Sequence, residues 1–186
     1  MTDDQILLEI ARGAIRAELA GREFPDPDPQ DYAPALRVRA ACFVTLLKAG
    51  ELRGCVGSLV ARQALVIEVA HNAVRAAFGD TRFPPLEKRE EHEVCLEISV
   101  LSPPEPFEVM DEADLLEQLR PGVDGLTLRQ GHRVATFLPT VWEQLPDPSQ
   151  FVRHLMQKGG WDAEVWPADM QCERYTTRLI QEPDTP

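Results

Sequence analysis

A pair of strand-like segments in residues 36–60 restricts the fold of this chain more than any other feature. Ala41 to Leu47 is an almost continuous apolar run, as expected of a strand that is covered on both faces. Lys48–Glu51 supplies a turn, and a second strand follows over Leu52–Leu59. Because strands joined by so short a turn run antiparallel, the segment predicts a β-hairpin.

Two helices are predicted on either side of this hairpin in the sequence. Residues 3–20 carry apolar side chains at helical spacing, Thr2 and Gln5 fit a capping box, and Gly21 fits a stop. Residues 62–78 carry a single apolar stripe. The opposite stripe of that helix is expected to face water, and it consists of Glu68, His71, Asn72 and Arg75.

Shorter patterns complete the expected fold. They predict a strand over 94–100, a helix over 111–119, paired strands at 126–128 and 134–138, a helix from Asp147 and a final strand over 172–180. Helices and strands are mixed, and many connections are hairpin-like. The fold class is therefore predicted as α+β, with a largely antiparallel sheet flanked by helices. The length predicts one domain over residues 1–186, with room for a smaller subdomain built from part of the chain.

Composition limits the partners of this protein. The formal net charge is −12 and the sequence pI is near 4.8, so this acidic protein should repel phosphate backbones and bind no nucleic acid. No apolar stretch approaches the roughly 18 residues of a membrane span. The N-terminus carries acidic residues where a signal peptide carries basic ones. We therefore expect a cytoplasmic protein with no membrane partner.

The cysteines form neither a zinc framework nor a disulfide framework. Cys42, Cys55, Cys95 and Cys172 are scattered, and no two of them make a C-x-x-C pair. Scattered cysteines fit a reducing compartment. The sequence predicts no metal site and implies no cofactor.

Cys55 is the sharpest candidate for chemistry. It lies between Gly54 and Gly57, which leave the backbone open to a close neighbour. A two-residue period puts Arg53 on the same face, where a guanidinium could stabilise the thiolate. The alternative is that Cys55 is a small buried hydrophobe and that the glycines mark a bulge or tight packing.

Three further positions complete the candidate site. His71 and Asp80 are candidates for the general base that would activate the thiol. Arg82 lies beside Phe83 in a loop stiffened by prolines, which suits an arginine that binds a small anionic ligand. The alternatives are an ion pair of Arg82 with Asp80 or Glu87, and a water-facing His71.

Several segments resemble, in order, the AMMECR-one domain family. They are Leu52–Gly57, which is similar to the signature hexapeptide of the family, Ala76–Pro85, Val100–Pro104, Val123–Leu126, Phe137–Trp142 and Lys158–Trp161. Val56 stands where the family usually has Ile, and Thr81 stands where it usually has Pro. The resemblance covers roughly residues 5–180, and its specificity lies in the ordered set.

The resemblance implies an α+β fold with a main domain and a smaller subdomain. In bacteria such proteins look like the A component of the AmmeMemoRadiSam set, which accompanies a Memo-like protein and a radical S-adenosylmethionine protein. No accepted reaction goes with the domain. Two functions stay open: an accessory or catalytic component with a small-ligand site beside Leu52–Gly57, or a non-catalytic protein-binding module in which that segment is a packing motif. The oligomeric state is left open as well.

Overall fold

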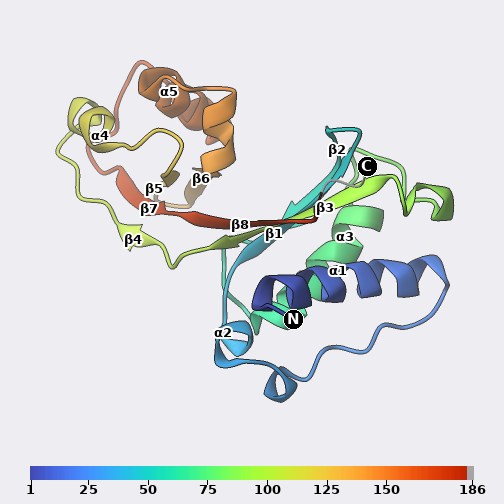
Figure 1. The fold of residues 1–186 in the computed structure, drawn as a ribbon. Coiled ribbons are helices and arrows are strands. Elements are labelled where there is room, and N and C mark those ends of the chain that lie inside the picture. Colours follow the sequence, from blue (N-terminus) through green and yellow to red (C-terminus); the bar gives the residue numbers. More distant parts are fainter. Residues whose placement is uncertain (184–186) are drawn as a thin grey trace. The chain divides into compact units, whose positions relative to one another are not determined.

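The computed structural model describes residues 1–183, which divide into two compact units. The first unit is Met1–Leu101 together with residues 178–183, and the second is Ser102–Thr177. Each unit has its own four-stranded sheet, with strand orders β2-β1-β3-β8 and β4-β7-β5-β6 (Figure 1). The α+β class is confirmed, but the strands form two antiparallel sheets where the sequence predicted one.

The sheet of the first unit is built on the predicted hairpin. β1 (Cys42–Lys48) and β2 (Glu51–Gly57) are antiparallel, and the turn places Ala49 at φ 52° and Gly50 at φ 80°. β3 (Val94–Leu101) pairs with the other side of β1, and β8 (Thr177–Gln181) lies beside β3. The hairpin is confirmed, although residues 34–37 form the short helix α2 (Pro34–Arg37).

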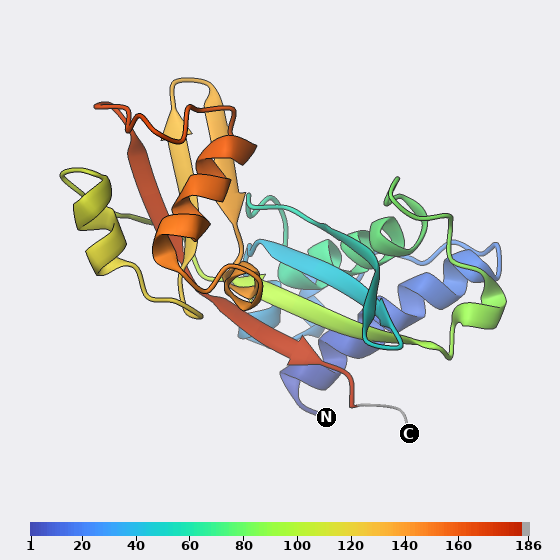
Figure 2. The same ribbon diagram turned by 90° about the horizontal axis from the view of Figure 1, so that it is seen from above.

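One expectation for β1 was wrong, because only one face of the strand is buried. Cys42, Val44 and Leu46 have no exposed surface, while the alternating residues are only half-buried. The physical reason is that α1 (Asp3–Leu19) and α3 (Leu65–Phe78) lie against a single face of the sheet (Figures 1 and 2).

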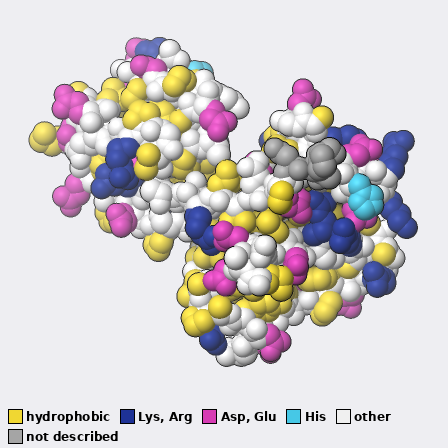
Figure 3. Space-filling model, viewed as in Figure 1, with side chains coloured by type: hydrophobic (Ala, Val, Ile, Leu, Met, Phe, Trp, Pro, Cys, Tyr) yellow, Lys and Arg dark blue, Asp and Glu magenta, His cyan; other side chains and the backbone are white. Residues whose placement is uncertain are grey.

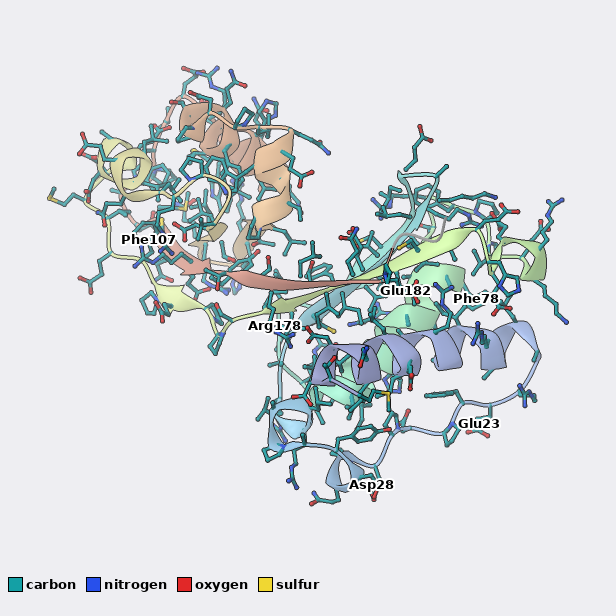
Figure 4. The ribbon with its side chains drawn as sticks, viewed as in Figure 1. Glu23, Asp28, Phe78, Phe107, Arg178 and Glu182 are labelled. Carbon is teal, nitrogen blue, oxygen red and sulfur yellow. The ribbon has the colours of Figure 1, made fainter. Side chains whose placement is uncertain are left out.

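The first helix begins and ends as its sequence predicts. Thr2 and Gln5 form the capping box, and Gly21 takes φ +63° after the last turn. The chain then runs through the segment that contains Glu23 and Asp28, both labelled in Figure 4, and through a 3-10 turn (Pro29–Asp31). Arg12 of α1 forms an ion pair with Glu182, which follows β8.

The polar stripe of α3 does not face water throughout, which corrects the expectation for that helix. His71 and Arg75 are exposed, but Glu68 is only 5% exposed and Asn72 only 1%. The reason is that this flank of the helix borders β1, where the side-chain amide of Asn72 donates to the Cys42 carbonyl at 3.1 Å.

The second unit packs two helices and a 3-10 turn around its sheet. Its strands are β4 (Glu105–Pro106), β5 (Gly125–Gln130), β6 (Arg133–Phe137) and β7 (Gln171–Tyr175). Its helices are α4 (Glu112–Gln118) and α5 (Pro148–Lys158), and the 3-10 turn covers Pro139–Glu143. Phe151 of α5 stacks on Trp142 with ring centroids 3.8 Å apart, and Phe107, labelled in Figure 4, belongs to the same core.

The predicted strand over residues 172–180 is in fact two strands. β7 belongs to the sheet of the second unit and β8 to the sheet of the first. Thr176 separates them, and it exchanges two hydrogen bonds with Ser102, through the Ser102 hydroxyl at 3.0 Å and the Ser102 backbone N–H at 2.9 Å. Alternation alone does not show where a strand leaves one sheet for another.

The surface carries charges of both signs. On the face drawn in Figure 3, Lys and Arg side chains occur together with Asp and Glu side chains on both units. In the stretch from residue 1 to residue 183, no helix has the length and apolar character that crossing a lipid bilayer requires.

Candidate functional site

The Cys55 side chain lies on the sheet face opposite to α1 and α3. Cys55 is paired with Thr45 of β1, and the Thr45 hydroxyl donates to Cys55 Sγ at 3.2 Å. A Cβ added to the preceding residue, Gly54, would lie 2.2 Å from the carbonyl oxygen of Ala76 in α3, so that residue faces the helix. Because successive residues of a strand face opposite sides, the half-buried thiol points away from the helix.

The exposed edge of β2 is covered at Cys55 by two side chains of the following loop. Asp80 Oδ2 accepts the backbone N–H of Cys55 at 2.9 Å, and Arg82 Nη2 donates to the Cys55 carbonyl at 3.3 Å. Arg82 Nη2 and Asp80 Oδ2 are themselves 2.7 Å apart. The hydrogen bond from Arg82 holds the pKa of the Asp80 carboxyl well below its usual range. We call Asp80 and Arg82 the edge clamp.

Arg53 is bonded along the same edge, at a β-bulge. Gly54 is opposite Leu46 and Leu52 is opposite Leu47, so Arg53 has no partner in β1. Its guanidinium binds both carboxylate oxygens of Glu90, at 3.1 Å from Nε and 2.9 Å from Nη2. Glu90 ends a short 3-10 turn (Lys88–Glu90). The bond from Arg53 lowers the pKa of Glu90 from 4.5 to about 2.

Tight packing explains both glycines of the segment. The 2.2 Å approach at Gly54 leaves no space for a side chain. A Cβ at Gly57 would lie 2.3 Å from the ring of Phe43, again too close for any other residue. These contacts match the packing alternative for the two glycines.

The structure brings most of the candidate residues together at this edge, but not His71. Phe83 lies beside the clamp, with its ring centroid 5.5 Å from the guanidinium carbon of Arg82. His71 belongs to α3, on the opposite face of the sheet from the thiol, and its ring bonds to Asp26 and Gln63. Asp80 accepts the backbone N–H of Cys55, whereas the hydrogen bond to the sulfur comes from the Thr45 hydroxyl.

Sequence reasoning missed two residues of this arrangement, Thr45 and Glu90. Thr45 carries a weak signal, because it interrupts an otherwise apolar run two positions from Phe43 and Leu47. Glu90 belongs to the acid-rich run 87–93, which was expected to be solvated surface, and nothing in the run distinguishes it.

The other cysteines provide a contrast to Cys55. All four are free thiols, and burial raises the pKa of Cys42 and of Cys172 to about 12. Cys95 is half-buried, and its Sγ lies 3.6 Å from the backbone carbonyl oxygen of Glu182.

Comparison with known proteins places residues 8–180 within the AMMECR1 family model, the AMMECR-one domain. A protein of Methanothermobacter thermautotrophicus is 38% identical over 183 residues, which are 97% of this chain and 94% of that protein. A protein of Thermofilum pendens is 33% identical, covering 95% of this chain and 88% of that protein. The crystal structure of the uncharacterized protein PH0010 from Pyrococcus horikoshii matches with a TM-score of 0.84 and 30% identity, over 95% of this chain and 89% of that one.

Proposed function

Because this chain belongs to the AMMECR1 family, we propose that it is an accessory or catalytic component that acts with a Memo-like protein and a radical S-adenosylmethionine protein. Its small-ligand site lies beside Leu52–Gly57, and the Cys55 thiol acts there as a nucleophile or redox group. One observation carries the proposal: the half-buried Cys55 thiol lies on the sheet face away from α3 and accepts the Thr45 hydroxyl at 3.2 Å.

Close packing and an ion pair explain three neighbours of Cys55. Gly54 and Gly57 are required by close contacts, and Arg53 is bonded to Glu90. A residue such as valine suits a half-buried strand position as well as cysteine does. The hydroxyl of Thr45 donates to the sulfur, and such a donor stabilises negative charge on that atom. A β-bulge next to Cys55 is also a feature that recurs beside active sites.

Arg82 is the residue that holds the anionic part of the ligand in this proposal. Its side chain is 55% exposed, and its Nε and Nη2 bond to Asp80. Within residues 1–183, its Nη1 has no hydrogen-bond partner and is available to an anion. Arg53 is only 11% exposed and is bonded to Glu90 through two nitrogens, so it orients the strand and does not meet the ligand.

The test is a reconstituted mixture with the Memo-like protein and the radical protein, in which cleavage of S-adenosylmethionine is measured. Cys55→Ser should abolish the contribution of this protein to that turnover, and mass spectrometry should find a ligand adduct on Cys55 alone. Cys95→Ser is the matched control, because Cys95 is the other half-buried cysteine. Equal turnover with Cys55→Ser and with the unmodified protein would remove the catalytic role.

A second candidate function is a non-catalytic protein-binding module. It is favoured by the bonding of Arg53, Asp80 and Arg82, all of which have structural partners. In that case, Cys55→Ala should bind the Memo-like or radical protein with unchanged affinity in a co-purification experiment. Absence of binding to both partners at micromolar concentration would count against the module.

A further inference from the structure

A hollow lies along the polar flank of α3, and the function proposed for Cys55 involves none of the residues that line it. Its volume is about 470 Å³, and it lies wholly in the first unit. Its polar lining consists of Arg62, Gln63, Glu68, His71, Asn72 and Arg75. Two of these residues are buried and the others provide charge and hydrogen-bonding groups around them, so the hollow combines a fixed interior with an exposed rim.

Asn72 presents a buried acceptor that lacks a donor. Its Nδ2 donates to the Cys42 carbonyl at 3.1 Å, which fixes the orientation of the amide, because the reverse orientation would oppose two oxygens. Among the described residues no group donates to its Oδ1, although Asn72 is only 1% exposed. A buried acceptor without a donor is costly, so this oxygen is suited to a ligand that brings one.

Glu68 presents a buried carboxylate without a cation. It is 5% exposed, and the hydrogen bond that it accepts is a long one, 3.4 Å from Asn72 Nδ2. In the part of the chain that the structure describes, no Lys, Arg or His forms an ion pair with it. Buried carboxylates are normally paired. A primary ammonium has three N–H donors, enough for both the Glu68 carboxylate and Asn72 Oδ1.

The interior of the hollow suits a cation, whereas its rim suits an anion. Arg62 and Arg75 are exposed, and over residues 1–183 neither forms an ion pair, in a protein whose net charge is −12. His71 also belongs to the lining, where its Nε2 lies 2.7 Å from Asp26 Oδ1 and its Nδ1 lies 3.0 Å from Gln63 Nε2. Two unpaired guanidinium groups suit a carboxylate or a phosphate.

We propose that this hollow binds a small zwitterion that carries a primary ammonium group at one end and a carboxylate or phosphate at the other. The ammonium donates to Glu68 and Asn72 Oδ1, and the anion is held by Arg62 and Arg75. His71 is a wall of this second site and has no part in chemistry at Cys55. The volume of about 470 Å³ is within the range of small-molecule sites.

The test uses the full chain with two soluble zwitterions, O-phosphoethanolamine and 4-aminobutanoate, in calorimetry and in NMR of the Asn72 side-chain amide. We expect one or both to bind with a dissociation constant below about 1 mM and to shift the Asn72 amide signals. Which one binds identifies the anion as phosphate or carboxylate. Ethyl phosphate, which lacks the ammonium, and ethylammonium, which lacks the anion, should each bind at least about tenfold more weakly.

Variants separate the two ends of the ligand. The isosteric Glu68→Gln should weaken the zwitterion about tenfold, and the double change Arg62→Gln with Arg75→Gln should do the same while leaving ethylammonium unaffected. Arg89→Gln is the matched control, since Arg89 is an exposed arginine away from this hollow. Cys55→Ser should bind normally, so the result is independent of the function proposed for that thiol. No binding of either zwitterion at about 10 mM, or unchanged binding by the double variant, would overturn the proposal.

Discussion

Asp80 accepts a hydrogen bond from the backbone of Cys55 at the edge of β2, where a neighbouring strand would otherwise supply the acceptor. The Asp80 carboxylate accepts the Cys55 backbone N–H at 2.9 Å, and Arg82 donates to the Cys55 carbonyl at 3.3 Å. An edge strand normally leaves such groups open to pairing with another chain. Here side chains from the Ala76–Pro85 segment satisfy them, so two of the family-like segments form one structural unit.

Removal of this carboxylate should loosen the edge of β2. We expect Asp80→Ala to lower the free energy of unfolding by about 1–3 kcal/mol, because it leaves a strand N–H without its acceptor and Arg82 without its partner. Urea denaturation measures the loss, and amide exchange at Cys55 should accelerate. Glu117→Ala, at an exposed carboxylate of the second unit, is the control. An unchanged urea midpoint for Asp80→Ala would show that the edge clamp does not stabilise the folded protein.

The Arg53–Glu90 pair should make stability depend on pH in the acid range. The pKa of Glu90 in the folded protein is about 2, below its ordinary value of 4.5. A carboxyl with a lowered folded pKa stabilises the protein fully above its unfolded pKa, and this contribution is lost as the pH falls from about 4.5 to about 2. Allowing for solvent screening, we expect a loss of about 1–2 kcal/mol over that interval.

Glu90→Gln tests this dependence, because glutamine keeps the shape and cannot titrate. The urea midpoints of Glu90→Gln and of the unmodified protein should converge as the pH falls. Once Glu90 is protonated, its ion pair with Arg53 no longer stabilises the folded state. A constant difference between them across the whole interval would mean that Arg53 does not lower the Glu90 pKa.

The glycines of the hexapeptide should tolerate no side chain. Gly54→Ala places a methyl group 2.2 Å from the Ala76 carbonyl oxygen, where only the backbone of α3 could move. We expect a loss of about 3 kcal/mol or more, or failure to fold. Gly122→Asn is the control, because Gly122 has open space around it and a φ of +75° that asparagine adopts readily. Equal thermal midpoints for the two variants would contradict the packing argument.

The four thiols should differ in their reaction with iodoacetamide. Burial raises the pKa of Cys42 and of Cys172 to about 12, so near pH 8 almost none of either is thiolate, and neither should be labelled in the native protein. Cys55 should react first, since it is half-buried and receives a hydroxyl donor. Mass spectrometry per cysteine over time measures the order. Labelling of Cys55 no faster than Cys172 would indicate a packed, inert side chain.

The candidate site could be predicted from the sequence only where its residues lie close together along the chain. The Gly-flanked Cys55 and the nearby Arg82 were recognised because spacing within a strand and a loop carries that information. Glu90 was not, because its pairing with Arg53 depends on how the chain returns along the edge of β2 after α3. His71 was a candidate base for Cys55, but α3 lies on the other face of the sheet and its His71 bonds to Asp26, because helical periodicity does not show which sheet face a helix covers.

The fold shows the same division between local and non-local information. The capping box of α1 and the hairpin of β1 and β2 follow from residues close in sequence, and both were predicted. The burial of Glu68 and Asn72 was missed because it depends on a neighbouring strand, β1. The end of β7 at Tyr175 was missed because alternation in the sequence does not show where a strand leaves one sheet for another.

The passage of the chain from β7 to β8 has a consequence for biosynthesis. The first unit holds β2, β1 and β3 before Ser102, but it receives β8 only after the entire second unit has been translated. While the ribosome produces residues 102–177, β3 therefore has no partner on its outer side. Since domains tend to fold as they emerge, the nascent chain should pass through a stage with a folded second unit and an incomplete first sheet. A factor that shields exposed strand edges would meet this protein at that stage.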